Sequence, residues 1–237
     1  MTPVFLYSST MKKYSFLLFD ADNTLLDFDE NERVSIYNTF RHFGLPCDER
    51  TLKLYHDINL MYWDMLARKE IEREVLLIKR FETLFEKVGI KTDAVETEDY
   101  YRTQLGQGCQ LIPGALDVCR KLKSGYKLYV ITNGVAKTQH SRLEGSGIAS
   151  LMDGIFISDE IGYNKPDRRF FDYVRKSIPG FEKSRALVIG DGLLSDIKGG
   201  RDYGLDTCYL NIYNSLNTTK SSPTLAAQSI TALLDLL

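Results

Sequence analysis

Tyr14-Ser-Phe-Leu-Leu-Phe-Asp-Ala-Asp-Asn-Thr24 is the stretch that decides the fold. Its apolar run, Phe16 to Phe19, is short and continuous, which favours a strand buried on both faces of a parallel sheet. Asp20 and Asp22 follow where such a strand would end. In open α/β sheets the ligand crevice lies outside the carboxyl ends of the strands, so we expect both carboxylates at the edge of a site. For this pair alone, an ordinary Asp-rich turn is an equal alternative.

The composition indicates a globular protein. Hydrophobic residues make up 43% of the 237 residues, enough for one core domain that carries a smaller insert. Lys and Arg number 30 against 32 Asp and Glu, a formal net charge of −2, so we expect no nucleic-acid polymer as a partner. No run approaches the roughly 20 apolar residues that span a bilayer, so no membrane is expected either.

The chain start and the cysteines predict a cytoplasmic protein. Residues 1–10 carry no basic region and no small-residue cleavage site, so we expect no signal peptide, with either Met1 or Met11 as the start. Four scattered cysteines, without a Cys-x-x-Cys pair, are expected to be free, buried thiols: Cys47, Cys109, Cys119 and Cys208. The histidines also lack metal-ligand spacing and are expected to be structural or exposed: His42, His56 and His140.

A block of helices separates the first strand from the remaining ones. Asp29, with Glu32 three residues later, predicts a capped helix start. Further helices are expected at residues 49–69, 73–88 and 96–105, with no strand between them. The block is too long for a crossover between neighbouring strands, so we interpret residues 28–108 as an inserted, all-helical domain.

From residue 109 onward, short apolar runs alternate with helical patterns. Strands are expected at residues 128–131, 155–157, 186–189 and 208–210. Helices are expected at 115–123, 136–145, 168–177 and 230–237, a further helix opens at Ser195-Asp196, and Asn214 to Pro223 is a candidate surface loop. This order predicts an α/β fold, a Rossmann-like, doubly wound parallel sheet formed by residues 11–27 and 109–237.

Polar residues follow four of the predicted strands. In chain order they are Asp20 and Asp22, then Thr132 and Asn133, then Lys165, and finally Asp191 and Asp196. Each group alone has an ordinary explanation as a turn, a helix cap or a solvated lysine. Because the carboxyl ends of parallel strands meet at one edge of a sheet, their shared position favours a common site.

The acidic residues of this site suit a divalent metal ion. A phosphate monoester repels an attacking carboxylate, and Mg²⁺, which prefers carboxylate and water oxygens, neutralises that charge. We expect Asp20 and Asp191 to be direct metal ligands. Asp22 is expected to contribute its backbone carbonyl, which leaves its side chain free for proton transfer. Asp196 is expected to hold a metal-bound water.

The remaining polar residues suit a phosphoryl group. The Thr132 hydroxyl, the Asn133 backbone N–H and the Lys165 ammonium are expected to bind the phosphoryl oxygens, where charge spreads in the transition state. This set of donors and acids needs no histidine base.

Four motifs of the chain resemble those of the haloacid dehalogenase (HAD) superfamily. In the same order, they are Asp20-Ala-Asp22-Asn-Thr24, Thr132-Asn133-Gly134, Lys165-Pro166 and Gly190-Asp191-(four residues)-Asp196. The helical block also falls where that superfamily inserts a cap. The resemblance implies a Rossmann-like core, a nucleophilic Asp20 that forms an aspartyl-phosphate, Asp22 as general acid and then base, and Mg²⁺ as cofactor.

Asp22 separates the chemistries within that superfamily. The dehalogenase branch has no carboxylate at this position, because displacing halide requires no proton on the leaving group, so Asp22 implies a phosphatase. Residues 19–25 and 157–166 are similar to the YjjG-type pyrimidine nucleotidases, although Gly192 and Leu193 differ from the small polar residues common there. The implied substrate is a nucleoside 5′-monophosphate.

Other functions stay open as alternatives. A phosphatase for phosphoglycolate or a sugar phosphate would share the core and differ in the cap. A 2-haloacid dehalogenase is a less favoured alternative. A non-catalytic binding protein is also less favoured, because its grouped carboxylates would repel one another without a metal. We expect the cap to set specificity, but Tyr55, Tyr62 and Trp63 receive no site role because packing within the helical block is the favoured reading for them. The sequence leaves a monomer and a homodimer open.

Overall fold

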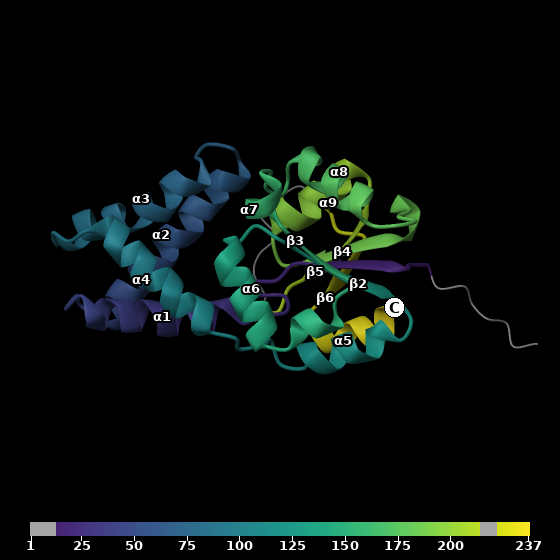
Figure 1. Ribbon diagram of the computed structural model, residues 1–237, viewed down its shortest axis with the longest axis horizontal. Coiled ribbons are helices and arrows are strands. Elements are labelled where there is room, and N and C mark those ends of the chain that lie inside the picture. Colours follow the sequence, from purple (N-terminus) through teal and green to yellow (C-terminus); the bar gives the residue numbers. More distant parts are fainter. Residues whose placement is uncertain (1–12, 214–221) are drawn as a thin grey trace, which may run out of the picture.

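The computed structural model describes residues 13–213 and 222–237. The choice between Met1 and Met11, and most of the loop expected at Asn214 to Pro223, lie outside these residues. Figure 1 shows a block of helices beside an α/β core, with helices on both faces of its sheet.

One parallel sheet forms the centre of the core, with the strand order β3-β2-β1-β4-β5-β6. The strands are β1 Phe16–Phe19, β2 Lys127–Thr132, β3 Gly154–Ile157, β4 Ala186–Gly190, β5 Asp206–Leu210 and β6 Leu225–Ala227. From β1 the chain first adds strands on one side and then on the other, which confirms the predicted doubly wound topology. The strand β6 was not predicted, because three residues are too few to carry a pattern and they form a strand only by pairing with β5.

Helices cover both faces of the sheet. Those of the core are α5 Ala115–Lys123, α6 Ala136–Gly145, α7 Ser158–Ile161, α8 Arg168–Ser177, α9 Gly199–Tyr203 and α10 Leu233–Leu236. Leu17 and Phe19 of β1 pack toward α5 and α6, whereas Phe16 and Leu18 pack toward α8 and α9. This alternation explains why the run in β1 is apolar throughout. The helix predicted at 230–237 is instead a short 3₁₀ turn, Ile230–Ala232, followed by α10.

The helical block contains α1 Phe28–His42, α2 Glu49–Ala67, α3 Arg73–Val88 and α4 Ala94–Gln107. Its helices share an apolar cluster of their own around Phe40, Tyr55, Phe81 and Tyr101. This separate cluster supports our proposal that residues 28–108 form a cap domain inserted between β1 and β2. The α4 helix packs beside α6, so the block adjoins the core (Figure 1).

The start of α1 differs from the sequence prediction. Asp27, not Asp29, is the capping residue, and its side chain accepts a hydrogen bond from the Glu30 backbone N–H at 3.2 Å. Glu32 is buried, where its carboxylate lies 2.5 Å from His56 Nδ1 and accepts from Asn59 Nδ2 at 2.6 Å. Glu32 therefore connects two helices of the cap rather than closing a capping box.

The cysteines and histidines form no common site. All four cysteines are free; Cys119 and Cys208 are buried as predicted, but Cys109 is exposed. The histidines have local partners: His42 stacks on Tyr100, His56 contacts Glu32, and His140 contacts Glu160.

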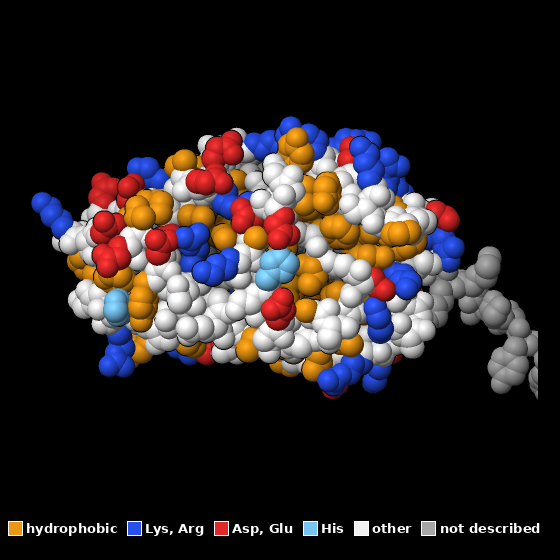
Figure 2. Space-filling view, viewed as in Figure 1, with side chains coloured by type: hydrophobic (Ala, Val, Ile, Leu, Met, Phe, Trp, Pro, Cys, Tyr) orange, Lys and Arg blue, Asp and Glu red, His pale blue; other side chains and the backbone are white. Residues whose placement is uncertain are grey.

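The surface carries both signs of charge side by side. Figure 2 shows Lys and Arg side chains interspersed with Asp and Glu on the face in view. Such mixing agrees with the formal net charge of −2. Among the helices that the structure describes, none is long and apolar enough to cross a membrane.

Candidate active site

The carboxyl ends of three adjacent strands place most of the predicted site residues together, and Lys165 comes from the segment that follows β3 and α7. The parallel register sets Phe19 of β1 opposite Val130 of β2 and Ile189 of β4. The residues that follow these strands therefore share one edge of the sheet. Cap residues line one wall of a cleft of about 850 Å³ there, and five predicted site residues line the other: Asp20, Asp22, Thr132, Asn133 and Lys165.

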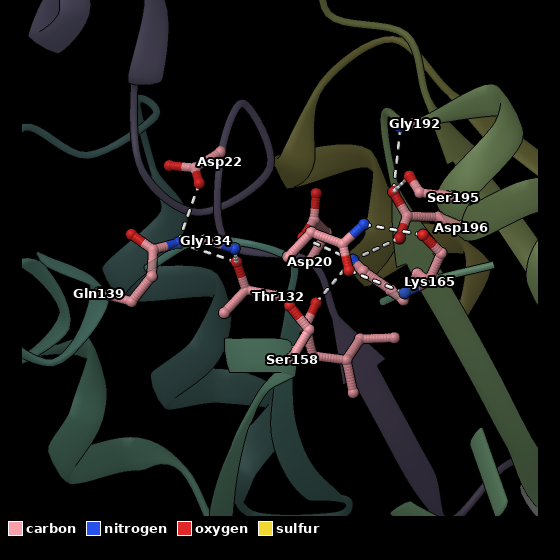
Figure 3. A network of polar contacts seen from close by, with 12 residues as sticks. Asp20, Asp22, Thr132, Gly134, Gln139, Ser158, Lys165, Gly192, Ser195 and Asp196 are labelled. Atoms are coloured by element: carbon pink, nitrogen blue, oxygen red, sulfur yellow. Dashed lines mark hydrogen bonds and ion pairs between the residues drawn. The ribbon is translucent and has the colours of Figure 1, made fainter. Parts of the chain in front are cut away.

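Lys165 lies at the centre of this edge. Its ammonium donates hydrogen bonds to Asp20 Oδ1 at 2.7 Å, to Asp196 Oδ1 at 2.6 Å and to the Ile131 carbonyl at 2.7 Å (Figure 3). The side chain is only 1% exposed. Burial by itself would lower the pKa of Lys165, but the charges of Asp196 and Asp20 outweigh it and raise that pKa. Lys165 is therefore a buried, charged partner of two acids.

Three carboxylates gather at the same point. One ligand oxygen each from Asp20, Asp191 and Asp196 lies within 4.8 Å of the other two. The pKa of Asp20 is raised to about 7, mainly because the carboxyl is buried and secondly because of the charge of Asp196. Burial, followed by the charge of Asp20, raises the pKa of Asp191 well above its usual value. A single ammonium does not neutralise three carboxylates, and this all-oxygen donor set fits Mg²⁺.

Asp196 is fixed from several sides. Its Oδ2 accepts hydrogen bonds from the Gly192 backbone N–H at 3.1 Å and from Ser195 Oγ at 3.2 Å, while Oδ1 faces Lys165. It lies in a short π-helix, Leu193–Lys198, that includes the helix start expected at Ser195-Asp196. A Cβ on Gly190 would lie 2.6 Å from Asp196 Cγ, so only glycine permits this approach of β4 to the carboxylate.

The Asp22 carboxylate does not belong to the acidic cluster. Its Oδ1 accepts from Arg142 Nη1 at 2.6 Å and its Oδ2 from Gln139 Nε2 at 2.9 Å. In Figure 3 it lies toward Gln139 and away from Lys165. The side chain thus takes a separate place in the cleft, and both the proton-transfer role and the backbone-carbonyl role of Asp22 stay proposals.

Thr132 and Asn133 follow β2 and contact the other motifs. Thr132 Oγ1 accepts hydrogen bonds from the Gly134 backbone N–H at 3.1 Å and from Gln139 Nε2 at 2.8 Å. The Asn133 side chain donates to the Lys165 carbonyl and accepts from the Lys165 backbone N–H, both at 2.8 Å. Asn133 therefore holds the segment that carries Lys165 in place, a contact that the sequence did not reveal.

Sequence reasoning also missed three buried residues near the site. Gln139 and Arg142 belong to α6, and each is 1% exposed. Arg73 begins α3 of the cap and reaches the core, where it donates to Asp159 Oδ1 at 2.9 Å and to the Asn133 carbonyl at 3.3 Å. Polar residues in helices normally face solvent, so no local pattern marked these three as buried.

The cap wall of the cleft has a polar base and two aromatic side chains, Phe28 and Trp63. Arg80 is 3% exposed and donates to Glu98 Oε2 at 2.6 Å and to Asn59 Oδ1 at 2.7 Å. Of the three aromatic residues considered from the sequence, Trp63 lines the cleft. Tyr55 is fully buried in the cap cluster, and Tyr62 hydrogen-bonds Thr83, so both pack as expected.

Comparison with known proteins agrees with this geometry. Residues 14–204 match the family model described as haloacid dehalogenase-like hydrolase. The chain is a haloacid dehalogenase-like hydrolase. This HAD-like hydrolase is 36% identical, over 94% of its length and 95% of the relative's, to the pyrimidine 5′-nucleotidase PynA of Streptococcus pneumoniae. It is 29% identical, over 95% of its length and 98% of the relative's, to the pyrimidine 5′-nucleotidase YjjG of Escherichia coli.

A solved structure extends the comparison to the fold. The HAD-hydrolase YfnB of Bacillus subtilis, in a crystal form bound to magnesium and described as revealing interdomain movement, is 36% identical to this HAD-like hydrolase. The two superpose with a TM-score of 0.91, covering 95% of this chain and 99% of that one. The identity and the TM-score together confirm the predicted HAD fold.

Proposed function

We propose that this HAD-like hydrolase is a Mg²⁺-dependent phosphomonoesterase that acts on nucleoside 5′-monophosphates through an aspartyl-phosphate on Asp20. The observation that carries the proposal is that Asp20, Asp191 and Asp196 gather at one point beside the cleft, where Lys165 contacts two of them. The choice of a nucleotide as the substrate rests on the relatives that are named pyrimidine 5′-nucleotidases.

In the first step, a carboxylate oxygen of Asp20 attacks phosphorus. The bond from phosphorus to the leaving oxygen breaks, and Asp22 gives that oxygen a proton. Lys165, the Thr132 hydroxyl and the Asn133 backbone N–H bind the phosphoryl oxygens, whose charge is stabilised in the transition state. The leaving group is a nucleoside in the cleft below the cap.

In the second step, Asp22 takes a proton from water, whose oxygen attacks phosphorus, and the bond to Asp20 breaks to release inorganic phosphate. Asp20, Asp191 and Asp196 would hold Mg²⁺, directly or through water, and the Asp22 carbonyl would complete the set. When bound, the ion neutralises charge between the acids and the phosphate.

The separate carboxylate of Asp22 favours a phosphatase over a dehalogenase. An alkoxide leaving group needs a proton, whereas halide does not, and Asp22 supplies an acid within the cleft. A phosphoglycolate or sugar-phosphate phosphatase remains the second candidate, because it would use the same core. Trp63 on the cap wall favours a nucleoside, since a flat aromatic surface can stack on a base.

A phosphate-release screen with Mg²⁺ or with EDTA tests the proposal. The panel contains nucleoside 5′-monophosphates, phosphoglycolate and sugar phosphates, with a 2-haloacid as a halide-release control. We expect Mg²⁺-dependent release with the highest kcat/KM on a nucleotide. Preference for a sugar phosphate would contradict the substrate, and no release from any ester would contradict the reaction.

Substitutions of the two motif aspartates test the intermediate. Asp20→Asn should abolish turnover while circular dichroism shows a folded protein, whereas Asp202→Asn, an exposed acid on α9, should retain activity. Asp22→Asn should slow turnover and leave one phosphoryl group on the protein, visible as a mass increase by intact-protein mass spectrometry. An Asp20→Asn enzyme with full activity would refute the assignment.

We also propose that the protein acts in the cytoplasm as a monomer or a homodimer, without a nucleic-acid or membrane partner. The mixed surface charge supports the absence of a nucleic-acid partner (Figure 2). Light scattering coupled to size-exclusion chromatography decides between monomer and dimer, and a larger assembly would contradict both.

A further inference from the structure

Gln139 and Arg142 contact the residues that we propose transfer the proton, Asp22, and bind the phosphoryl group, Thr132. Both project from α6, both are 1% exposed, and both line the cleft. Figure 3 shows Gln139 next to Asp22 and Thr132, at the amino end of α6. The mechanism above gives neither residue a role, although burying a glutamine and an arginine is costly unless their polar atoms are paired.

Arg142 fixes the direction of the Gln139 amide. A guanidinium can only donate hydrogen bonds, so Arg142 Nη1, 3.0 Å from Gln139, faces the amide oxygen Oε1. The amide nitrogen must then face the other way. The Asp22 carboxylate, an acceptor 2.9 Å from Nε2, requires the same orientation. Two independent contacts therefore agree on which end of the amide is nitrogen.

The Gln139 amide in turn fixes the Thr132 hydroxyl. Gln139 Nε2 has two hydrogens, and it donates one to Asp22 Oδ2 and the other to Thr132 Oγ1. The Gly134 backbone N–H donates to the same Thr132 oxygen. A hydroxyl has two acceptor sites and one hydrogen, so Thr132 has used its acceptor capacity. Its own hydrogen remains to be donated, and within the described residues no hydrogen bond places it on a protein acceptor.

The backbone of the second motif is shaped to fit this glutamine. A Cβ on Gly134 would lie 2.5 Å from Gln139 Cγ and 2.7 Å from Nε2. Real Cβ atoms do not approach so closely, so a side chain at position 134 would displace the amide. Gly134 thus permits both its own N–H contact with Thr132 and the close approach of Gln139.

We propose that Gln139, oriented by Arg142, is a positioning residue that fixes the Thr132 hydroxyl as a hydrogen-bond donor to the phosphoryl group. The proposal rests on the proposed function, in which Thr132 binds that group. A preset donor matches an unprotonated phosphoryl oxygen and needs no reorientation when the ester binds. Gln139 and Arg142 act through Thr132 and exchange no proton themselves.

The test measures binding of inorganic phosphate in the presence of Mg²⁺ by isothermal titration calorimetry, in a double-mutant cycle. Gln139→Leu removes the donor to Thr132, and Thr132→Val removes the hydroxyl with little change in shape. An oriented hydrogen bond to a charged group corresponds to a factor of roughly 10 to 100 in affinity, so Gln139→Leu should weaken phosphate binding by about this factor. In a protein that already carries Thr132→Val, adding Gln139→Leu should change the affinity for phosphate by less than about twofold.

Controls separate positioning from general damage. Lys137→Met, on the exposed side of α6, should bind phosphate as the wild type does. Thr132→Ser keeps a hydroxyl and should keep the dependence on Gln139. If Gln139→Leu does not fold, Gln139→Met, which fills more of the same space without a donor, takes its place in the cycle.

Three results would overturn the inference. Equal weakening by Gln139→Leu with and without the Thr132 hydroxyl would show that the glutamine acts through packing or through Asp22. Unchanged phosphate affinity in Gln139→Leu, in an enzyme that hydrolyses phosphate esters, would remove the positioning role and leave the proposed function intact. A wild-type protein that neither binds phosphate nor releases it from any ester would refute the proposed function, and this proposal with it.

Discussion

Lys165→Met tests whether the buried ammonium is the internal counter-ion of the acidic cluster. The lysine makes three hydrogen bonds of 2.6–2.7 Å, two of them to the carboxylates of Asp20 and Asp196. Methionine replaces most of the apolar stem, so the loss is mainly electrostatic. Removing one member of a buried ion pair costs about 3–5 kcal/mol, because the partner charge stays buried without compensation. We expect the free energy of unfolding to fall by this amount when EDTA is present.

Mg²⁺ should recover much of that loss if it binds the same acids. A ligand that binds the native state at about 100 times its Kd adds about 2.7 kcal/mol of stability. The assay is urea unfolding followed by circular dichroism, with EDTA and with saturating MgCl₂. Lys198→Met is the matched control, since Lys198 lines the same cleft but pairs with the exposed Asp202, and its unfolding free energy should not change measurably.

Two results would contradict the role of Lys165 as the counter-ion of the metal-binding acids. A loss below about 1 kcal/mol in Lys165→Met would show that the acids do not depend on the lysine, since that is the size of an ordinary substitution. A large loss that Mg²⁺ leaves unchanged would separate the lysine from the metal site.

Three further predictions address the metal and the cap. Mg²⁺ should raise the melting temperature of the wild type in differential scanning fluorimetry, and Asp191→Asn should remove most of that rise; an equal rise would exclude Asp191 as a ligand. The hydrogen bond that His56 donates to the Glu32 carboxylate raises the pKa of His56 above 6.5, so the stabilisation from this pair is complete below pH 6.5 and is lost as the pH rises through the higher folded-state pKa. The melting temperature of His56→Gln should therefore differ most from wild type in acid, and a difference independent of pH would contradict this. Arg80→Met, which removes the buried partner of Glu98 and leaves it only the more distant Arg102 at 3.4 Å, should lower the unfolding free energy by about 3–5 kcal/mol in urea. The addition of Glu98→Gln should recover part of this loss, and no recovery would point to packing instead.

The acidic cluster was within reach of sequence reasoning, although its members lie far apart in the chain. Asp20 and Lys165 are 145 residues apart, yet their side chains meet at 2.7 Å. Asp20 directly follows one apolar strand, and Lys165 comes shortly after another. Parallel strands align their carboxyl ends, so both residues reach the same edge of the sheet. The pattern of a strand followed by polar residues is local, and the topology of the sheet brings those ends together.

The residues that orient the site could not be predicted from the sequence. Gln139, Arg142 and Arg73 are polar residues in helices, a pattern that ordinarily predicts a solvent-exposed surface. Glu32 matched a capping box by spacing, but the structure buries it against His56 and Asn59. In each case the deciding interaction comes from another element, so no local spacing could distinguish burial from exposure.

By itself the sequence determined the α/β core, the inserted helices and the set of acids with their lysine, because these follow from hydrophobic period and from residue types at strand ends. The tertiary structure alone decided that Gln139 and Arg142 hold the Asp22 carboxylate, that Trp63 faces the cleft, and that Gln139 lies against Thr132. The direction of a side chain and the donor or acceptor role of its atoms depend on neighbours that only packing supplies.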